Sequence, residues 1–183
     1  MGLDKETDVS DKKLDFLRYE VGLLSLQAAL STRNKNYPIY SDNCSGSSKK
    51  ILKKRLRQEL YNLEVKYIDG KVTSDQHCNN IELLSKKITE EFKDILYGNC
   101  FRFGVSQKIL NLYLKYLWTM GIIAEPPHCP LDGIISTKAD LYYIWTESDS
   151  RIDYESIIFD FSKIAYPKSC AVWELENFKR RDQ

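Results

Sequence analysis

Residues 104–135 read GVSQKILNLYLKYLWTMGIIAEPPHCPLDGII, and this stretch decides the fold of the chain. Its apolar part, residues 109–123, is rich in Ile, Leu, Tyr and Trp and contains Lys115 as its only charge. A helix that is apolar nearly all round is normally buried at the centre of a domain. We therefore expect a buried central helix here, with Lys108 in its opening turn and Asp132 beyond its end.

A first amphipathic helix is expected well before this stretch. Apolar residues recur at steps of three and four from Asp11 to about Ser31, which is the spacing of one helix face. The inner face is expected to contain Leu14, Leu17, Val21, Leu24 and Ala28. Residues 1–10 are polar, and we expect them to fray.

A second helix is expected after the Tyr37–Ser48 loop, and its two faces differ in charge. Its inner face carries Leu52, Leu56, Leu60 and Leu63. Its outer face is strongly basic and includes Lys49, Lys53 and Arg57. Such a face is either a solvated helix surface or a track for nucleic-acid phosphates, whose binding would weaken steeply with salt.

The remaining patterns are also helical. Thr73 and Gln76 have the spacing of a capping box, which opens a third helix that should end near residues 97–98. Residues 154–164 have helical periodicity, and a short last helix is expected from residue 169. Residues 136–149 remain open between a short strand and a buried helical turn. The fold is therefore expected to be predominantly all-α, with about six helices in one compact domain over residues 1–183.

Composition places the chain among ordinary globular proteins. It has 183 residues, 43% of them hydrophobic and 29% charged, and a net charge of +1. This net charge is too small to attract the whole chain to nucleic acid or to a membrane, so any such binding needs a local patch of basic residues. Five cysteines without CxxC pairs, behind a polar first turn, predict free thiols in the cytoplasm. The longest apolar run is too short for a comfortable membrane span, so no membrane contact is expected.

No metal or cofactor is expected either. His77-Cys78 and His128-Cys129 contain ligand types, but their spacing matches no standard zinc pattern. No cysteine cluster of the iron–sulfur type occurs, and the phosphate-binding glycine motifs are missing.

The turn before the central helix has a wider implication. Gly98 closes one expected helix, GVSQK at 104–108 opens the next, and PLDGII at 130–135 places Pro-x-Asp before apolar residues. This order resembles the helix-hairpin-helix motif of the base-excision DNA glycosylases, and it is most similar to the 8-oxoguanine DNA glycosylase branch over about residues 96–135. The resemblance implies a helix-hairpin-helix core at 73–183, around the buried central helix, and an N-terminal helical part at 11–70.

The resemblance also implies a reaction. Lys108 would be the nucleophile and Asp132 the catalytic carboxylate of a DNA glycosylase that excises an oxidised or modified base, in repair or in defence against modified foreign DNA. A lysine amine attacks the sugar C1′ only when it is neutral, so its pKa must fall from about 10.4. Burial and the positive end of the helix dipole both lower it. The Schiff base that follows permits strand cleavage by AP lyase chemistry.

The expected partner is DNA with a damaged or modified base, bound by a monomer. A helix N-terminus binds phosphate through its free amides. The residues expected to do so in the hairpin are Phe103, Gly104, Val105, Ser106 and Gln107. A base flipped from the duplex enters a pocket with apolar or aromatic walls. The candidates for these walls are Trp118, Tyr142, Tyr143 and Trp145, and the sequence does not choose among them.

Two other functions remain open from the sequence. In the first, the chain is a non-catalytic helical interaction module in which Lys108 and Asp132 form a buried or capping pair, because Pro-x-Asp commonly begins a helix. In the second, it binds DNA through the hairpin without chemistry.

Overall fold

The computed structural model describes residues 3–179, with side chains described from residue 9 onward, and its regular elements over this range are helices. The seven α-helices are α1 (Leu3–Leu30), α2 (Gly46–Glu64), α3 (Ser74–Phe92), α4 (Phe103–Thr119), α5 (Gly133–Lys138), α6 (Arg151–Ala165) and α7 (Cys170–Asn177). Short 3-10 helices occupy Val65–Tyr67, Lys93–Ile95 and Tyr97–Asn99. Within the described range no strand forms, and Tyr40 and Leu96 make one isolated bridge. The all-α class is confirmed.

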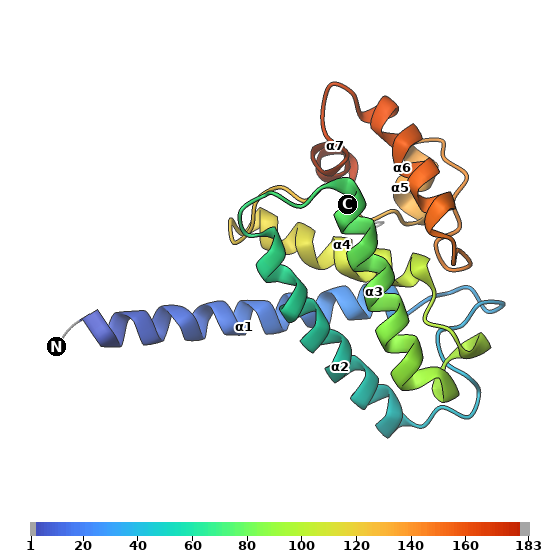
Figure 1. Cartoon of the computed structure of the whole chain (residues 1–183), viewed down its shortest axis with the longest axis horizontal. Coiled ribbons are helices and arrows are strands. Elements are labelled where there is room, and N and C mark those ends of the chain that lie inside the picture. The colour runs from blue at the N-terminus through green and yellow to red at the C-terminus, as the bar shows by residue number, and fades with distance from the viewer. Residues whose placement is uncertain (1–2, 180–183) are drawn as a thin grey trace.

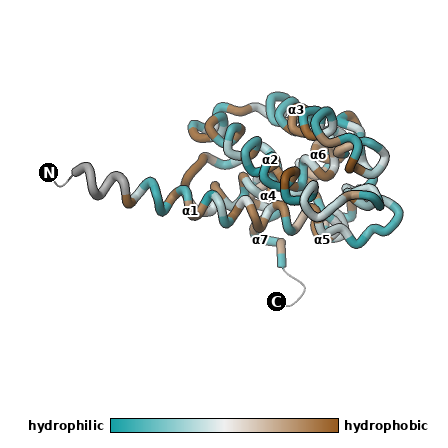
Figure 2. Tube along the Cα trace, turned by 90° about the horizontal axis from the view of Figure 1, so that it is seen from below, coloured by the Kyte–Doolittle hydropathy of each residue, from teal (hydrophilic) through white to brown (hydrophobic). Residues whose placement is uncertain are grey.

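Helix α4 is the central element, as its apolar sequence predicts. Ile109, Leu110, Leu114 and Leu117 on this helix have no exposed surface. In Figure 2, α2 and α3 lie on one side of α4, and α5 and α7 lie on the other. The helix begins at Phe103, so Lys108 lies in its second turn and not in the opening turn as expected.

Helix α1 differs from the expectation in both its start and its buried face. It begins at Leu3 rather than at residue 11, because no proline or glycine interrupts residues 3–21. Figure 1 shows its N-terminal part extending away from the other helices. Of the expected inner face, Val21 is buried, whereas Leu17 and Leu24 are exposed, so that face is wrong in part. The other buried residues of α1 include Ser25, Leu26, Ala29 and Leu30. The buried face therefore combines large apolar side chains with small ones.

Helices α2 and α3 form as the sequence predicts. All four leucines of the expected inner face of α2 are buried. The capping box at the start of α3 is present, since Thr73 Oγ1 accepts from the Gln76 amide at 3.2 Å and Gln76 Oε1 accepts from the Thr73 amide at 2.9 Å. Helix α3 ends at Phe92, earlier than expected, and the two short 3-10 helices continue to Asn99.

A chain of buried polar side chains crosses the core between α3, α4 and α6. His77 Nε2 donates to Asn111 Oδ1 at 2.7 Å, and His77 Nδ1 accepts from the Tyr67 hydroxyl at 2.8 Å. Asn111 Nδ2 donates to the Tyr154 hydroxyl at 3.0 Å, which in turn donates to His128 Nδ1 at 3.0 Å. Each ring is therefore neutral, and each of these nitrogens is paired.

Acid is expected to destabilise the fold through these two histidines. Burial lowers the pKa of His77 from its ordinary 6.5 to about 4, and it lowers the pKa of His128 as well. Between these pH values the unfolded chain binds protons that the folded protein rejects, so the free energy of unfolding falls as the pH falls. His77 alone corresponds to a loss of about 3 kcal/mol by pH 4. Urea unfolding at a series of pH values measures this loss.

The upper part of the pH range separates this effect from ordinary acid denaturation. Most carboxylates titrate below about pH 5, so a loss that begins between pH 6.5 and pH 5 belongs to the histidines. A free energy of unfolding that stays constant over that interval would contradict the prediction.

Two further sequence expectations bear on the class of protein. The five cysteines carry free thiols, of which Cys78, Cys129 and Cys170 are buried. Among the described helices, none is both long enough and apolar enough to cross a membrane.

Candidate active site

Lys108 and Asp132 meet in space although the chain between them leaves α4 and returns. The Lys108 Nζ lies 3.5 Å from Asp132 Oδ2, and 11% and 15% of their side-chain surfaces are exposed. Lys108 comes from the second turn of α4, and Asp132 is the residue immediately before α5. The two residues singled out by the sequence therefore form one ion pair.

Asp132 also caps α5. Its Oδ1 accepts from the amides of Ile134 and Ile135 at 2.9 and 3.2 Å, as an N-cap carboxylate does. These bonds fix the carboxyl group and leave Oδ2 directed toward Lys108. The capping interpretation and the catalytic interpretation of Asp132 are thus both compatible with this geometry.

Lys108 is nearly buried, and its surroundings act on its charge in opposite directions. The residue is 9% exposed, and its Nζ lies 4.0 Å from the centre of the Trp145 ring, a contact that favours the ammonium form. Burial lowers the pKa of Lys108 below its ordinary value, while the charge and hydrogen bond of Asp132 act in the opposite direction. Because Lys108 is in the second turn of α4, burial rather than the helix N-terminus is the main cause of this shift.

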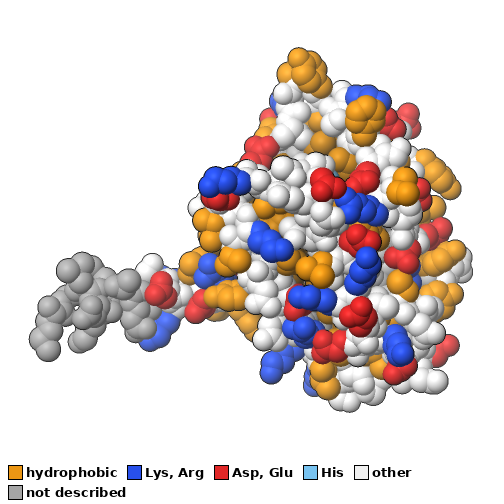
Figure 3. Space-filling view, viewed as in Figure 1, with side chains coloured by type: hydrophobic (Ala, Val, Ile, Leu, Met, Phe, Trp, Pro, Cys, Tyr) orange, Lys and Arg blue, Asp and Glu red, His pale blue; other side chains and the backbone are white. Residues whose placement is uncertain are grey.

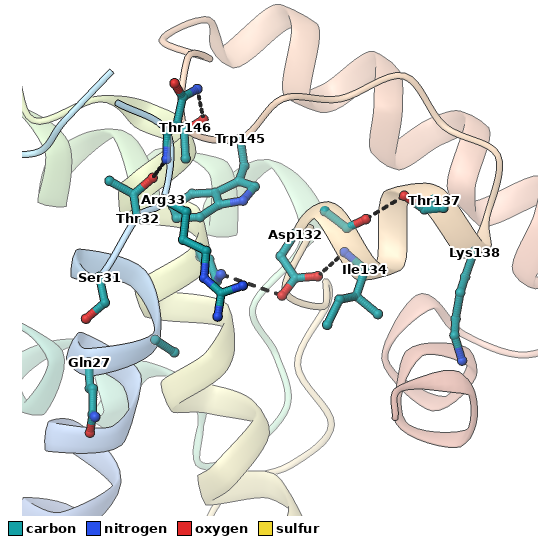
Figure 4. A pocket seen from close by; sticks show the side chains of 14 residues that line it. Gln27, Ser31, Thr32, Arg33, Asp132, Ile134, Thr137, Lys138, Trp145 and Thr146 are labelled. Carbon is teal, nitrogen blue, oxygen red and sulfur yellow. Dashed lines mark hydrogen bonds and ion pairs between the residues drawn. The ribbon is translucent and has the colours of Figure 1, made fainter. Parts of the chain in front are cut away.

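Two cavities meet at the Lys108–Asp132 pair. The larger, with a volume of about 890 Å³, is polar at its mouth, where Arg33, Asn34 and Lys138 contribute to the lining. Figure 4 shows the Arg33 side chain extending toward Asp132, with the Trp145 ring behind it. The cavity is formed by the end of α1, the loop after it, α4, α5 and the loop that contains Trp145.

The second cavity lies on the other side of the pair, between α4 and α7. It has a volume of about 460 Å³. Its walls are mostly apolar and include Leu112, Tyr116, Pro130, Leu175 and Phe178. Lys115 and Glu174 add a nearly buried ion pair of 2.7 Å to the same cavity. Ala28, Lys108 and Asp132 line both cavities, so the Lys108 amine lies where the two cavities adjoin.

Among the aromatic candidates, Trp145 is the ring at the amine. Trp145 lines the larger cavity, whereas Tyr142 is 89% exposed and Tyr143 packs against Tyr154 in the core. Residues 141–145 form neither a strand nor a helix. Because Trp145 lies in an irregular loop without periodicity, no sequence pattern distinguished it from its neighbours.

The hairpin residues do not form the expected phosphate site. Phe103, Gly104, Val105, Ser106 and Gln107 are all buried. The Phe103 amide donates to Asp149 Oδ1 at 2.8 Å, and the Gly104 amide donates to the Ser148 carbonyl oxygen at 2.9 Å. The loop at 145–149 therefore covers this helix N-terminus and uses its amides, which corrects the expectation of a phosphate at these atoms.

The basic face of α2 lies away from the two cavities. Among the described residues, none of the cavity linings comes from α2. Lys49 and Arg57 instead lie over the rings of Tyr40 and Tyr19, and Lys53 is exposed. Figure 3 shows that basic and acidic side chains are interspersed on the face that carries α2 and α3. This is the pattern of a solvated surface and not of a single phosphate track.

The histidine and cysteine pairs do not come together as ligands. The rings of His77 and His128 pack edge to face with centroids 4.7 Å apart, and their nitrogens are used by the buried polar chain. His128 Nε2 also donates to the Ser74 hydroxyl at 2.7 Å. In the part of the chain that the structure describes, no group of three or more such side chains is placed to hold a metal ion.

Comparison with known proteins found no matching family and no significant match among curated proteins or solved structures.

Proposed function

We propose that the chain is a DNA glycosylase with AP lyase activity, in which Lys108 attacks the sugar and Asp132 assists. The observation that carries the proposal is a nearly buried amine, 3.5 Å from a carboxylate, at the junction of two cavities. Buried lysines with lowered pKa values are typical of Schiff-base catalysis. The resemblance over residues 96–135 implies the same pair.

The two cavities suit the two parts of a nucleotide. Arg33 and Lys138 at the polar mouth suit a phosphate, and the mostly apolar cavity beside Phe178 suits a base removed from the stack. A volume of about 460 Å³ is within the range of small-molecule sites. The C1′ atom that joins sugar to base would then lie at the junction, next to the Lys108 amine.

The reaction in this site balances without a cofactor. The Lys108 lone pair forms a bond to C1′ while the bond from C1′ to the base breaks, and the departing base takes its electrons and a proton. Opening of the sugar ring between C1′ and O4′ gives the imine, with the amine proton passing to O4′. Asp132 stabilises the positive charge that develops at C1′ and shuttles protons. β-Elimination from the imine cleaves the strand at the 3′ phosphate.

Borohydride trapping tests the proposal directly, because it reduces the imine to a stable amine. The full chain is mixed with duplexes that carry one oxidised purine, another modified base, or no lesion. The expected result is a covalent adduct with a duplex that still carried its modified base when it was mixed with the protein. The undamaged duplex should give no adduct. Salt-sensitive binding without an adduct on any lesion would support a DNA-binding protein instead.

The competing function is a non-catalytic helical protein in which the ion pair is structural. The N-cap bonds of Asp132 favour it, because they give the carboxylate a use that needs no substrate. Absence of DNA binding at low salt in the same assay would leave this reading alone.

Asp132→Asn is expected to slow adduct formation about 100-fold with little change in DNA affinity. Asparagine also caps helices well, so α5 should remain in place while the negative charge is lost. Single-turnover trapping gives the rate, and fluorescence anisotropy gives the affinity. The matched control is Asp140→Asn, an exposed aspartate after α5, which should react at the rate of the unaltered protein. A rate for Asp132→Asn within a few-fold of that rate would remove Asp132 from the mechanism.

A further inference from the structure

Gln107, the residue before Lys108, holds the loop that carries Asp132. Its Nε2 donates to the Leu131 carbonyl oxygen at 2.7 Å, and its Oε1 accepts from the Leu131 amide at 3.3 Å. The next residue of α4, Lys108, contacts the next residue of the loop, Asp132. Two successive residues of the helix therefore contact two successive residues of the loop. Gln107 and Leu131 have no exposed surface, so water does not compete for these bonds.

The direction of the Gln107 amide is set by the buried polar chain. Asn111 Nδ2, one turn later on α4, donates to Gln107 Oε1 at 3.1 Å. Asn111 is itself oriented by His77, which donates to its Oδ1 at 2.7 Å. Gln107 Oε1 must therefore be the acceptor, and its Nε2 must face the Leu131 carbonyl oxygen.

The segment held by Gln107 packs into the core, where Cys129 and Leu131 are buried, and side-chain hydrogen bonds hold it at two points. Residues 124–132 form no helix or strand. Within this segment, His128 is fixed by its bonds to Ser74 and Tyr154, and Leu131 is fixed by Gln107. Asp132 follows directly, so its distance from Lys108 depends on where Leu131 is held as well as on its N-cap bonds to α5.

We infer that Gln107 is a positioning residue that keeps the Asp132 carboxylate against the Lys108 amine. Its consequence for catalysis rests on the proposed function, whereas its effect on the pair does not. Loss of the two bonds would let Asp132 move away, which removes the interaction that raises the Lys108 pKa. The charged groups that line the two cavities with Lys108 are Arg33, Lys115, Asp132, Lys138 and Glu174.

Titration of the Lys108 side chain by NMR tests this inference without a substrate. The pKa of Lys108 in Gln107→Leu is expected to fall to the value measured in Asp132→Asn. The double variant should give that same value, because Gln107 acts through Asp132. A Lys108 pKa in Gln107→Leu equal to that of the unaltered protein would overturn the inference.

A buried hydrogen bond elsewhere provides the control for stability. Ser85 is buried, and its hydroxyl donates to the Phe101 carbonyl oxygen at 2.6 Å. Ser85→Ala should lower stability as a lost buried bond does, but it should leave the Lys108 titration unchanged. If both variants shifted the titration equally, the shift would reflect general loosening and the inference would fail.

The trapping rate then connects the positioning role of Gln107 to the reaction. Gln107→Leu is expected to slow adduct formation about 10- to 100-fold, and adding it to Asp132→Asn should cause no further loss. If the unaltered protein forms no adduct with any lesion, the proposed function fails. The titration then still tests whether Gln107 positions Asp132.

Hydrogen exchange decides the matter if Gln107→Leu does not fold. In the unaltered protein the Leu131 amide should exchange as slowly as the core amides of α4, because Gln107 accepts it inside the protein. Exchange of the Leu131 amide as fast as that of the exposed Gly133 amide would contradict the inference that Gln107 holds Leu131.

Discussion

Lys108→Gln is expected to abolish the borohydride-trapped adduct and strand cleavage altogether. Glutamine has no nucleophilic nitrogen. Among the described lysines, Lys108 alone lines both cavities, and the Asp132 carboxylate lies 3.5 Å from its amine. Other parts of the site would remain, so DNA affinity should change little. Folding should also be retained, because a neutral side chain avoids the cost of burying the Lys108 charge. Mass spectrometry of the trapped complex and a gel assay of the cleaved strand measure the two losses.

The same substitution at Lys53 provides the matched control. Lys53 is exposed on α2, away from both cavities, so Lys53→Gln should form the adduct at the rate of the unaltered protein. An adduct that persists in Lys108→Gln, or disappears in Lys53→Gln, would assign the nucleophile to another residue.

The pH dependence of the reaction follows from the same amine. Only neutral Lys108 attacks, so the trapping rate should rise with pH and level off above the pKa of Lys108. Burial lowers this pKa, so the plateau should begin at a lower pH than for an ordinary lysine.

The sequence was most informative where periodicity and chemistry coincide. The nearly uncharged run at 109–123 predicted the central helix, and the residues at its edges, Lys108 and Asp132, proved to be partners. The helical periodicity of α1 was less informative, because its buried face includes Ser25 and Ala29 beside Leu26, whereas Leu24 is exposed. Hydrophobicity alone does not identify small or polar residues that a helix buries.

Residues whose roles depend on long-range contacts were missed. Trp145 reaches Lys108 from an irregular loop, and Gln107 turns inward to the Leu131 backbone rather than outward to a phosphate. Neither role follows from local spacing, because each depends on how distant segments pack. The hairpin amides were misassigned for the same reason, since the loop that covers them lies over 40 residues further along the chain.

Gly104→Ala is expected to destabilise the fold by about 3 kcal/mol, and to displace the loop that carries Trp145. A Cβ at residue 104 would lie 2.0 Å from the Trp145 carbonyl oxygen and 3.0 Å from that of Ser148. Both are backbone atoms, so the contact cannot be relieved by a side-chain rotation. The loop is also held by Arg102, whose Nε donates to the Thr146 carbonyl oxygen at 2.7 Å. Chemical denaturation measures the loss of stability.

The loop displacement gives Gly104→Ala a second, independent consequence at the site. Once Trp145 moves from its place 4.0 Å from the Lys108 amine, water enters around the amine and the pKa of Lys108 should rise toward its ordinary value. Gly46→Ala is the matched control, because a Cβ there meets nothing within 4 Å. It should preserve both stability and the Lys108 titration. If Gly104→Ala proved as stable as Gly46→Ala, the close packing of this loop on α4 would be wrong, and with it the burial that lowers the pKa of Lys108.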